Sequence, residues 1–254
     1  MMNSQQIELV KSTVPVLREN GVALTSYFYN RMLNNNPELK NVFNLDHQST
    51  GRQARALAAA VLAYADNIEN PSVLAKAVER ITTKHISLNI QPEQYPIVGE
   101  NLLYSISEVL DVPFESELIE AWKQAYMQLA DILIGVEKQK YSDLSQHQGG
   151  WAGWRSFTIR QIEEQAEGKR FTLEAADGQP VAPAKAGNFI SVRVKEPGHD
   201  IVQPLQFSFT EDQGNHYQFL VKPDSTPTEY SVADILLKNY KEGDQVDVTA
   251  PVSF

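Results

Sequence analysis

One histidine of this chain is placed to face the interior of a helical domain. His85 follows Ile81 by four residues and Val78 by seven, so it lies on the apolar face of its helix. A zinc site would need further ligands, but the chain has no cysteine and no second histidine in a suitable position. A haem iron needs one protein ligand, because the porphyrin supplies the other nitrogens. His85 is therefore either a buried structural histidine, the commoner case for a lone histidine, or a haem ligand.

Two further polar side chains could serve such a haem. Gln53 lies one helical turn before Leu57 and continues the apolar stripe of its helix. Tyr29 directly follows the apolar Phe28. Both could be boundary residues that turn their polar ends toward water. If they face a haem, they supply an amide and a phenol that can hydrogen-bond its gaseous ligand.

A carboxylate also falls on an apolar stripe. Glu137 is in phase with Leu129 and Leu133 near the end of the last long helical segment. A carboxylate in this position commonly reaches out to solvent. The alternative is that it accepts the N–H of an iron-ligating histidine, which increases the imidazolate character of the ring. Tyr95, at the start of the preceding helix, could complete the same hydrogen-bonded cluster.

The elements that position these residues are helical up to about Tyr141, where apolar residues recur every three to four positions. Asn3 or Ser4 is expected to cap the first helix. Polar residues 46–51 are expected to form a loop, after a short turn of helix that contains Leu39 and Phe43. Six helices are expected, marked by the segments Ile7–Leu17, Leu24–Met32, Leu57–Ile68, Pro71–Ile81, Pro92–Val109 and Glu115–Leu133. The third, fourth and sixth of them also include Gln53, His85 and Glu137.

The periodicity changes after a glycine-rich segment, Gln148–Trp154, which we take as a domain boundary. Short alternating segments follow, with one helix, Ser231–Tyr240, among them. The pattern predicts a small barrel or sandwich. The expected strands are Phe157–Ile162, Phe171–Ala175, Phe189–Val194, Gln206–Phe209, Tyr217–Val221 and Val246–Val248.

Composition narrows the classes of partner. The net charge of −10 disfavours phosphate backbones and anionic lipid, so we expect neither nucleic acid nor a membrane as partner. The N-terminus lacks the apolar core of a signal peptide, and the apolar segment Ala56–Ala65 is too short to span a bilayer. The absence of cysteine excludes disulfides and thiolate chemistry. A cytoplasmic protein is expected.

Ordered motifs in the helical part resemble the globin domain of bacterial flavohaemoglobins, the nitric oxide dioxygenase family. The resemblance extends over residues 1 to about 141 and implies a haem-binding globin fold. The glycine-rich junction and the strands after it resemble the flavin-binding barrel of the same family. The matching segments are Phe28–Met32, Asn36–Lys40, Val42–Asn44, Tyr64–Asn70, Lys84–His85, Ile90–Glu100 and Ala121–Tyr126.

The resemblance implies a role for each candidate residue. His85 corresponds to the proximal iron ligand of haem b, and Tyr95 and Glu137 to its hydrogen-bonding pair. Tyr29, Gln53 and Leu57 correspond to the distal residues, and Phe43 to the phenylalanine that wedges the haem. Lys84, Val98 and Tyr126 complete the haem-binding set. The iron is expected to be pentacoordinate and to bind O2 and NO.

The flavin motifs are altered at the positions that would touch the cofactor. An Arg-x-Tyr-Ser motif is replaced by Leu205–Ser208, and leucine cannot pair with a phosphate. A Pro-Gly-x-Tyr stretch becomes Ala186–Phe189, and the glycine-rich phosphate turn becomes Thr226–Ser231, with a proline that has no N–H to donate. Near the end, Ala250–Phe254 lacks the usual glycine. We therefore expect FAD to be absent.

These features predict an α + β chain of two domains, a globin at 1–146 and a six-stranded antiparallel β-barrel of the ferredoxin-reductase FAD-binding type at 147–254. No Gly-x-Gly-x-x-Gly fingerprint occurs, and we expect a naturally short form without the nicotinamide-binding domain. One hypothesis is nitric oxide dioxygenase-like activity that depends on an external reductase. The other is a gas or redox sensor, or an oxygen-binding module, whose barrel contacts a partner or a second copy. A barrel that only covers the globin is also left open.

Overall fold

The computed structural model describes residues 2–195, 198, 200–225 and 231–254, without the side chains of residues 46 and 47. The chain forms two compact units, which are described in turn. The first unit contains residues 1–39, 47–82 and 91–136. The second contains residues 40–46, 83–90 and 137–254. The boundary that the sequence predicts after residue 146 stays a prediction.

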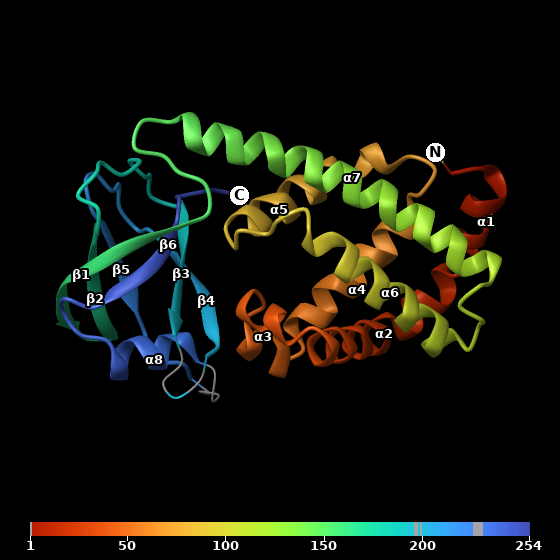
Figure 1. The fold of residues 1–254 in the computed structure, drawn as a ribbon, viewed down its shortest axis with the longest axis horizontal. Coiled ribbons are helices and arrows are strands. Elements are labelled where there is room, and N and C mark those ends of the chain that lie inside the picture. The colour runs from red at the N-terminus through yellow and green to blue at the C-terminus, as the bar shows by residue number, and fades with distance from the viewer. Residues whose placement is uncertain (1, 196–197, 199, 226–230) are drawn as a thin grey trace. The chain divides into compact units, whose positions relative to one another are not determined.

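Short connections join the successive helices that precede the sheet (Figure 1). The two 3-10 helices are η1 (Pro37–Asn41) and η2 (Pro71–Leu74). The α-helices that precede the sheet are α1 (Ser4–Ser12), α2 (Val14–Asn35), α3 (Leu45–Ser49), α4 (Arg52–Asp66), α5 (Ala75–Ile86), α6 (Gln94–Leu110) and α7 (Glu117–Gln146).

Two local predictions were wrong. The single helix expected over Ile7–Leu17 is divided at Thr13, because Pro15 has no N–H with which to continue the ladder of α1 and instead lies in the first turn of α2. The loop expected at residues 46–51 is helical at α3, a short polar helix without the apolar periodicity that would have revealed it. The expected cap was right, because the Asn3 side chain accepts a hydrogen bond from the Gln6 amide at 2.9 Å.

The core of the first unit forms where α2 packs against α4 and α6. Leu24, Phe28 and Met32 of α2 are almost fully buried there. Small residues let α2 and α4 approach closely, since Gly21 lies beside the Ala58 methyl group. The Thr25 hydroxyl donates to the Ala54 carbonyl oxygen at 2.7 Å. This close contact orients α4, the helix that carries Gln53 and Leu57.

A six-stranded antiparallel sheet forms most of the second unit, in the order β4-β3-β6-β1-β2-β5. Each expected strand is confirmed, with bounds that differ by a few residues. Among the described residues no ladder joins β4 to β5, so the sheet is not closed and the term barrel applies only loosely. The strands are β1 (Trp154–Gln165), β2 (Gly168–Ala175), β3 (Phe189–Lys195), β4 (Val202–Ser208), β5 (Tyr217–Val221) and β6 (Gln245–Thr249).

The expected helix near the end is confirmed as α8 (Val232–Asn239), which packs against β3, β4 and β5 (Figure 1). The Ser231 hydroxyl caps it by accepting from the Asp234 amide at 3.1 Å. Aromatic rings fill the interior of the sheet, including Phe157, Phe171 and Tyr217, none of which is measurably exposed. In the same unit, Ile86 at the end of α5 packs with Phe189 and Val252.

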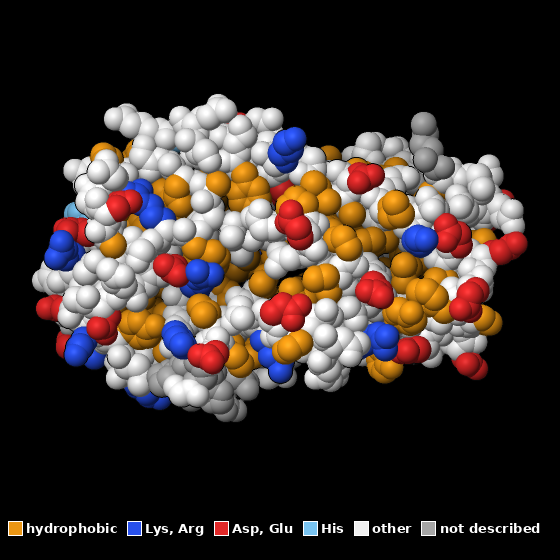
Figure 2. Space-filling view, in the orientation of Figure 1, with side chains coloured by type: hydrophobic (Ala, Val, Ile, Leu, Met, Phe, Trp, Pro, Cys, Tyr) orange, Lys and Arg blue, Asp and Glu red, His pale blue; other side chains and the backbone are white. Residues whose placement is uncertain are grey.

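Charged side chains of both signs lie on the surface (Figure 2). On the face drawn in Figure 2, acidic and basic side chains are interspersed, with apolar side chains between them. Within the described part of the chain, no helix combines the length and apolar character needed to cross a bilayer.

Candidate functional site

The His85 and Glu137 side chains meet in the second unit. His85 lies on the last turn of α5 and Glu137 on the C-terminal part of α7, and His85 Nδ1 is 2.7 Å from Glu137 Oε1. The Glu137 side chain is only 3% exposed, whereas that of His85 is 29% exposed. A carboxylate can only accept, so Nδ1 carries the hydrogen and the lone pair of the neutral ring lies on Nε2. This tautomer suits a metal-ligating histidine with a carboxylate behind it.

Tyr141 supports the same region. Its hydroxyl donates to the Ile90 carbonyl oxygen at 2.8 Å. Burial raises the pKa of the Tyr141 phenol, and the nearby Glu137 charge raises it further. The phenol therefore remains a hydrogen-bond donor, and it ties α7 to the turn that follows α5.

Lys84 and Phe43 also belong to the second unit. Lys84 precedes His85 on α5, and its Nζ donates to Gln206 Oε1 on β4. Phe43 is half-buried in the bend that follows η1. Asn41 and Asn44, on either side of Phe43, are hydrogen-bonded to Val202 and Pro204 of β4.

Tyr29, Gln53 and Leu57 lie in the first unit, on α2 and α4. Tyr29 is 9% exposed, and burial raises the pKa of its phenol above the ordinary value. Gln53 Oε1 accepts a hydrogen bond from the Gln48 amide, and both Gln53 and Leu57 are half-buried. The phenol of Tyr29 is therefore a protonated donor at neutral pH.

Tyr95, Val98 and Tyr126 also lie in the first unit. The Tyr126 hydroxyl of α7 donates to the Tyr95 carbonyl oxygen of α6 at 2.6 Å. Its ring packs so closely over Gly99 that a β-carbon there would lie 2.4 Å from Tyr126 Cε1. α6 and α7 are thereby fixed against each other at Tyr95. That the Tyr95 phenol joins the His85–Glu137 pair stays a prediction.

A metal cluster held only by side chains is not found. Among the described residues, no group of three or more acidic or histidine side chains could hold a metal ion. The donor set instead fits haem, because one imidazole with its Nδ1 hydrogen-bonded to a buried carboxylate is sufficient for an iron that a porphyrin already holds.

Two residues at the flavin motif positions, Leu205 and Phe207, pack into the apolar interior of the sheet. Leu205 on β4 packs against the apolar cluster of the sheet. The Phe207 ring is 8% exposed and stacks on Phe219 of β5 with centroids 4.4 Å apart. Neither side chain can bond a phosphate or a polar ring edge. Of the altered turn Thr226–Ser231, all but Ser231 lies outside the described residues.

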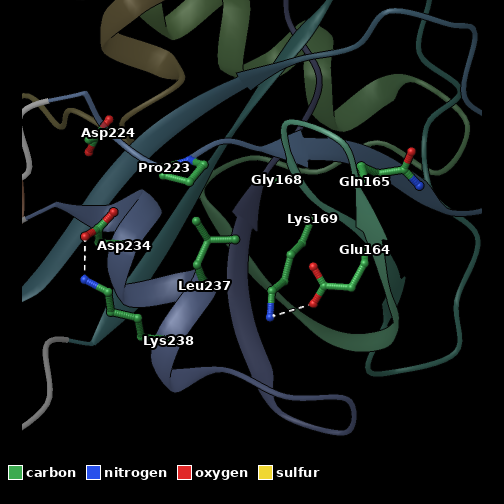
Figure 3. Close-up of a pocket in the computed structure, with 9 residues that line it drawn as sticks. All are labelled: Glu164, Gln165, Gly168, Lys169, Pro223, Asp224, Asp234, Leu237 and Lys238. Atoms are coloured by element: carbon green, nitrogen blue, oxygen red, sulfur yellow. Dashed lines mark hydrogen bonds and ion pairs between the residues drawn. The ribbon is translucent and has the colours of Figure 1, made fainter.

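An open pocket of about 500 Å³ elsewhere in the second unit does not qualify as the site. Figure 3 shows Lys238 directed toward Asp234 and Lys169 directed toward Glu164. Lys238 Nζ is 2.6 Å from an Asp234 oxygen, and Lys169 Nζ is 3.1 Å from a Glu164 oxygen. The first pair lies within α8 and the second joins neighbouring strands β1 and β2, so these four charges are neutralised locally. It is lined by Glu164, Gln165, Gly168, Lys169, Pro223, Asp224, Asp234, Leu237 and Lys238.

Two polar residues near His85, Ser87 and Gln206, were not predicted from the sequence. Ser87 is completely buried beyond the end of α5, and its hydroxyl accepts from Gln206 Nε2 at 2.7 Å. The two residues are 119 positions apart, so no local pattern links them. The signal for Gln206 was its position between the apolar residues Leu205 and Phe207 at the start of a predicted strand.

The comparisons with known proteins agree with this arrangement. The globin family model matches residues 26–133. A flavohemoprotein of Bordetella pertussis is 46% identical over 99% of this chain, which spans 63% of that protein. The crystal structure of a Malassezia yamatoensis flavohemoglobin with bound FAD and heme superposes with a TM-score of 0.86 at 25% identity, over 99% of this chain and 64% of that one.

A bacterial globin from Campylobacter jejuni gives the clearest assignment for the helical part. It is 39% identical, with a TM-score of 0.53, over 55% of this chain and 99% of the globin. The predicted fold class, a helical globin part followed by a flavohaemoglobin-type antiparallel sheet, is confirmed by these matches. The chain belongs to the globin family, and over 99% of its length it is similar in sequence and in fold to part of the flavohaemoproteins it matches.

Proposed function

We propose that the chain binds haem b through Nε2 of His85 and supports nitric oxide dioxygenase-type chemistry with electrons from an external reductase. The observation that carries the proposal is the 2.7 Å bond between His85 Nδ1 and the nearly inaccessible Glu137 carboxylate. An ordinary boundary histidine has no need of a buried negative charge, which is costly to desolvate. A metal-ligating histidine gains basicity from it.

The haem would supply a pentacoordinate iron at which O2 and NO react. The reaction joins one NO, one O2 and one electron into one nitrate ion. Glu137 holds the His85 ring in the tautomer with the lone pair on Nε2. Tyr29 keeps its phenolic hydrogen, because burial raises its pKa, and donates it toward the gaseous ligand. Gln53 supplies a second donor, and Leu57 excludes water.

The remaining assigned residues hold the cofactor. Phe43 packs on the haem, and Lys84, Val98 and Tyr126 line it. Tyr95 belongs to the proximal hydrogen-bonding group, and the Tyr126 bond to its carbonyl oxygen fixes its backbone. In this proposal the globin extends over residues 1–146 and the flavin-type sheet over 147–254.

The dependence on an external electron donor rests on the sheet. The Malassezia flavohemoglobin has both FAD and heme bound. In this chain, Leu205 and Phe207 offer apolar side chains at the corresponding motif. We therefore propose that FAD does not bind here and that a separate reductase reduces the haem. An absence of disulfides fits a reducing compartment such as the cytoplasm.

A gas or redox sensor is the second candidate, because Lys84 and Ser87 of the His85 segment are hydrogen-bonded to β4. A change at the haem could then alter the sheet and its contact with a partner or a second copy. Hydrogen exchange of ferrous, ferric and nitrosyl protein would test this. Identical exchange of residues 151–254 in all three forms would contradict a sensor.

The first experiment is to assay released haem and flavin in the purified 254-residue chain, with His85→Ala and the exposed His216→Ala as a matched pair. The parent and His216→Ala should hold about one haem per chain and no flavin, and the ferrous oxygenated protein should turn ferric on addition of NO. His85→Ala should lose the haem. Haem retained in His85→Ala would refute the assignment, and stoichiometric flavin would refute the need for an external donor.

A further inference from the structure

Three hydrogen bonds form a closed ring around the histidine-bearing end of α5. Lys84 Nζ donates to Gln206 Oε1. Gln206 Nε2 then donates to Ser87 Oγ at 2.7 Å, and Ser87 Oγ donates to the Lys84 carbonyl oxygen at 2.8 Å. The ring therefore begins and ends on Lys84 and passes through one side chain of β4.

The ring connects Lys84 with Ser87 and therefore spans the backbone that carries His85. The His85 carbonyl oxygen accepts from the amides of Leu88 and Ile90, each at 3.0 Å. Lys84 and Ser87, which precede and follow the pair His85–Ile86, are thus held both by the local turn and by Gln206. The far side of the imidazole is fixed by Glu137.

The same strand also holds the segment that contains Phe43. Gln203, which is completely buried, accepts from the Leu45 amide at 2.8 Å and donates to the Lys40 carbonyl oxygen at 2.7 Å. Asn44 Nδ2 donates to the Pro204 carbonyl oxygen at 2.8 Å, and Asn41 Oδ1 accepts from the Val202 amide at 2.8 Å. Four bonds therefore fasten residues 40–46 to the first half of β4.

We propose that β4 is a positioning strand of the haem site, and that Gln206 is the positioning residue that sets the orientation of the His85 imidazole. This inference rests on the proposed haem ligation by His85. The strand supplies no ligand and touches no reacting atom. It aligns two segments, one with Phe43 and one with His85, through side chains that lie outside the globin sequence.

Gln206 uses both ends of its side-chain amide. The oxygen accepts a charged donor and the nitrogen donates to a buried hydroxyl, which no apolar residue can imitate. Loss of Gln206 would leave Ser87, which is fully buried, with its Lys84 bond alone. The turn would then relax, because its remaining bonds are local.

The test compares Gln206→Leu with Gln206→Glu and with Ser208→Ala, an exposed control on the same strand. Gln206→Leu removes both arms of the ring, whereas Gln206→Glu keeps the acceptor for Lys84 and removes the donor to Ser87. The readouts are the iron–histidine stretching band of the ferrous holoprotein in resonance Raman spectra and amide hydrogen exchange of Leu88 and Ile90 in the haem-free chain. Circular dichroism and haem content establish that each variant is folded.

We expect Gln206→Leu to shift or broaden the iron–histidine band and to accelerate exchange at Leu88 and Ile90 about tenfold. Gln206→Glu should fall between Gln206→Leu and the parent, and Ser208→Ala should match the parent. A parental band and parental exchange in folded Gln206→Leu would overturn the proposal; should that variant not fold, Gln206→Glu decides by the same readouts. Failure of the parent chain to bind haem would instead refute the proposed function, and the exchange measurement would still test the ring.

Discussion

Substitution of Glu137 by glutamine is the sharpest test of the His85–Glu137 pair. The change keeps the size of the side chain and its oxygen acceptor but removes the negative charge that lies 2.7 Å from His85 Nδ1. A carboxylate in this position increases the electron density that the imidazole passes to a bound iron. Because ferric iron benefits more from that density than ferrous iron, Glu137→Gln should raise the reduction potential of the haem.

The size of the effect follows from the hydrogen bond. A bond to a charged group contributes about 1.5–3 kcal/mol and a neutral one about 0.5–1.5 kcal/mol, so the charge accounts for about 1–1.5 kcal/mol. If this difference acts on the ferric state alone, the potential rises by about 40–65 mV, since a one-electron couple moves by about 59 mV for each 1.4 kcal/mol. Only 3% of the carboxylate side chain is exposed, so solvent screens little of this effect.

The assay is a redox titration followed by the visible spectrum of the haem. Asp131→Asn, which neutralises an exposed carboxylate on the same helix, is the matched control and should leave the potential unchanged. An unchanged potential in Glu137→Gln, with haem still bound, would show that the carboxylate does not act on the iron ligand. The charge would then have only a structural role in the second unit.

Three further predictions concern the first unit. Gly99→Ala should lower the free energy of unfolding by about 1–3 kcal/mol in urea titrations, because the new methyl group meets Tyr126, whereas Gly135→Ala on α7, with open space around it, should not. Asn3→Ala should lower the free energy of unfolding by about 1 kcal/mol in the same assay, because it removes the capping box of α1. Burial raises the pKa of Tyr29, so the stability that its phenol contributes is complete below pH 10, the pKa of tyrosine in the unfolded chain, and declines above it. Tyr29→Phe should therefore lessen the loss of stability at alkaline pH, measured by unfolding at a series of pH values.

The positions of the elements were predictable because periodicity is a local property. Helical spacing located α4, α6 and α7, and alternation located all six strands. The break at Thr13 was less visible, since apolar residues continue in phase through Val10, Val14 and Leu17 and only Pro15 reports the interruption.

Half of the candidate site could be reasoned from one helix at a time. The inward face of His85 and the in-phase position of Glu137 came from spacing alone, and the structure brings their side chains together. Spacing could not say that they meet, because α5 and α7 are separated by α6 in the sequence. The resemblance to flavohaemoglobins supplied that pairing, and it also supplied the roles of Tyr29, Gln53 and Leu57, which stay predictions.

The polar contacts of β4 were beyond sequence reasoning for a physical reason. From sequence alone, a glutamine on a half-buried strand is expected to face solvent. Its actual hydrogen-bond partners depend on which segments the tertiary fold brings near. Gln206 and Gln203 reach segments more than a hundred residues earlier in the chain. A buried amide needs such partners, so burial was the missing information rather than residue type.

The alternation of side chains along β4 gives the two faces of this strand different roles. Leu205 and Phe207 turn to the apolar cluster of the sheet, where Phe207 stacks on Phe219. Gln206 lies between them and turns to the other face, where it bonds Lys84 and Ser87. One face of the strand therefore belongs to the interior of the sheet, and the other holds neighbouring segments of the second unit. The polar side chains of β4 hold the segments that bear His85 and Phe43, a role that requires no cofactor on the sheet.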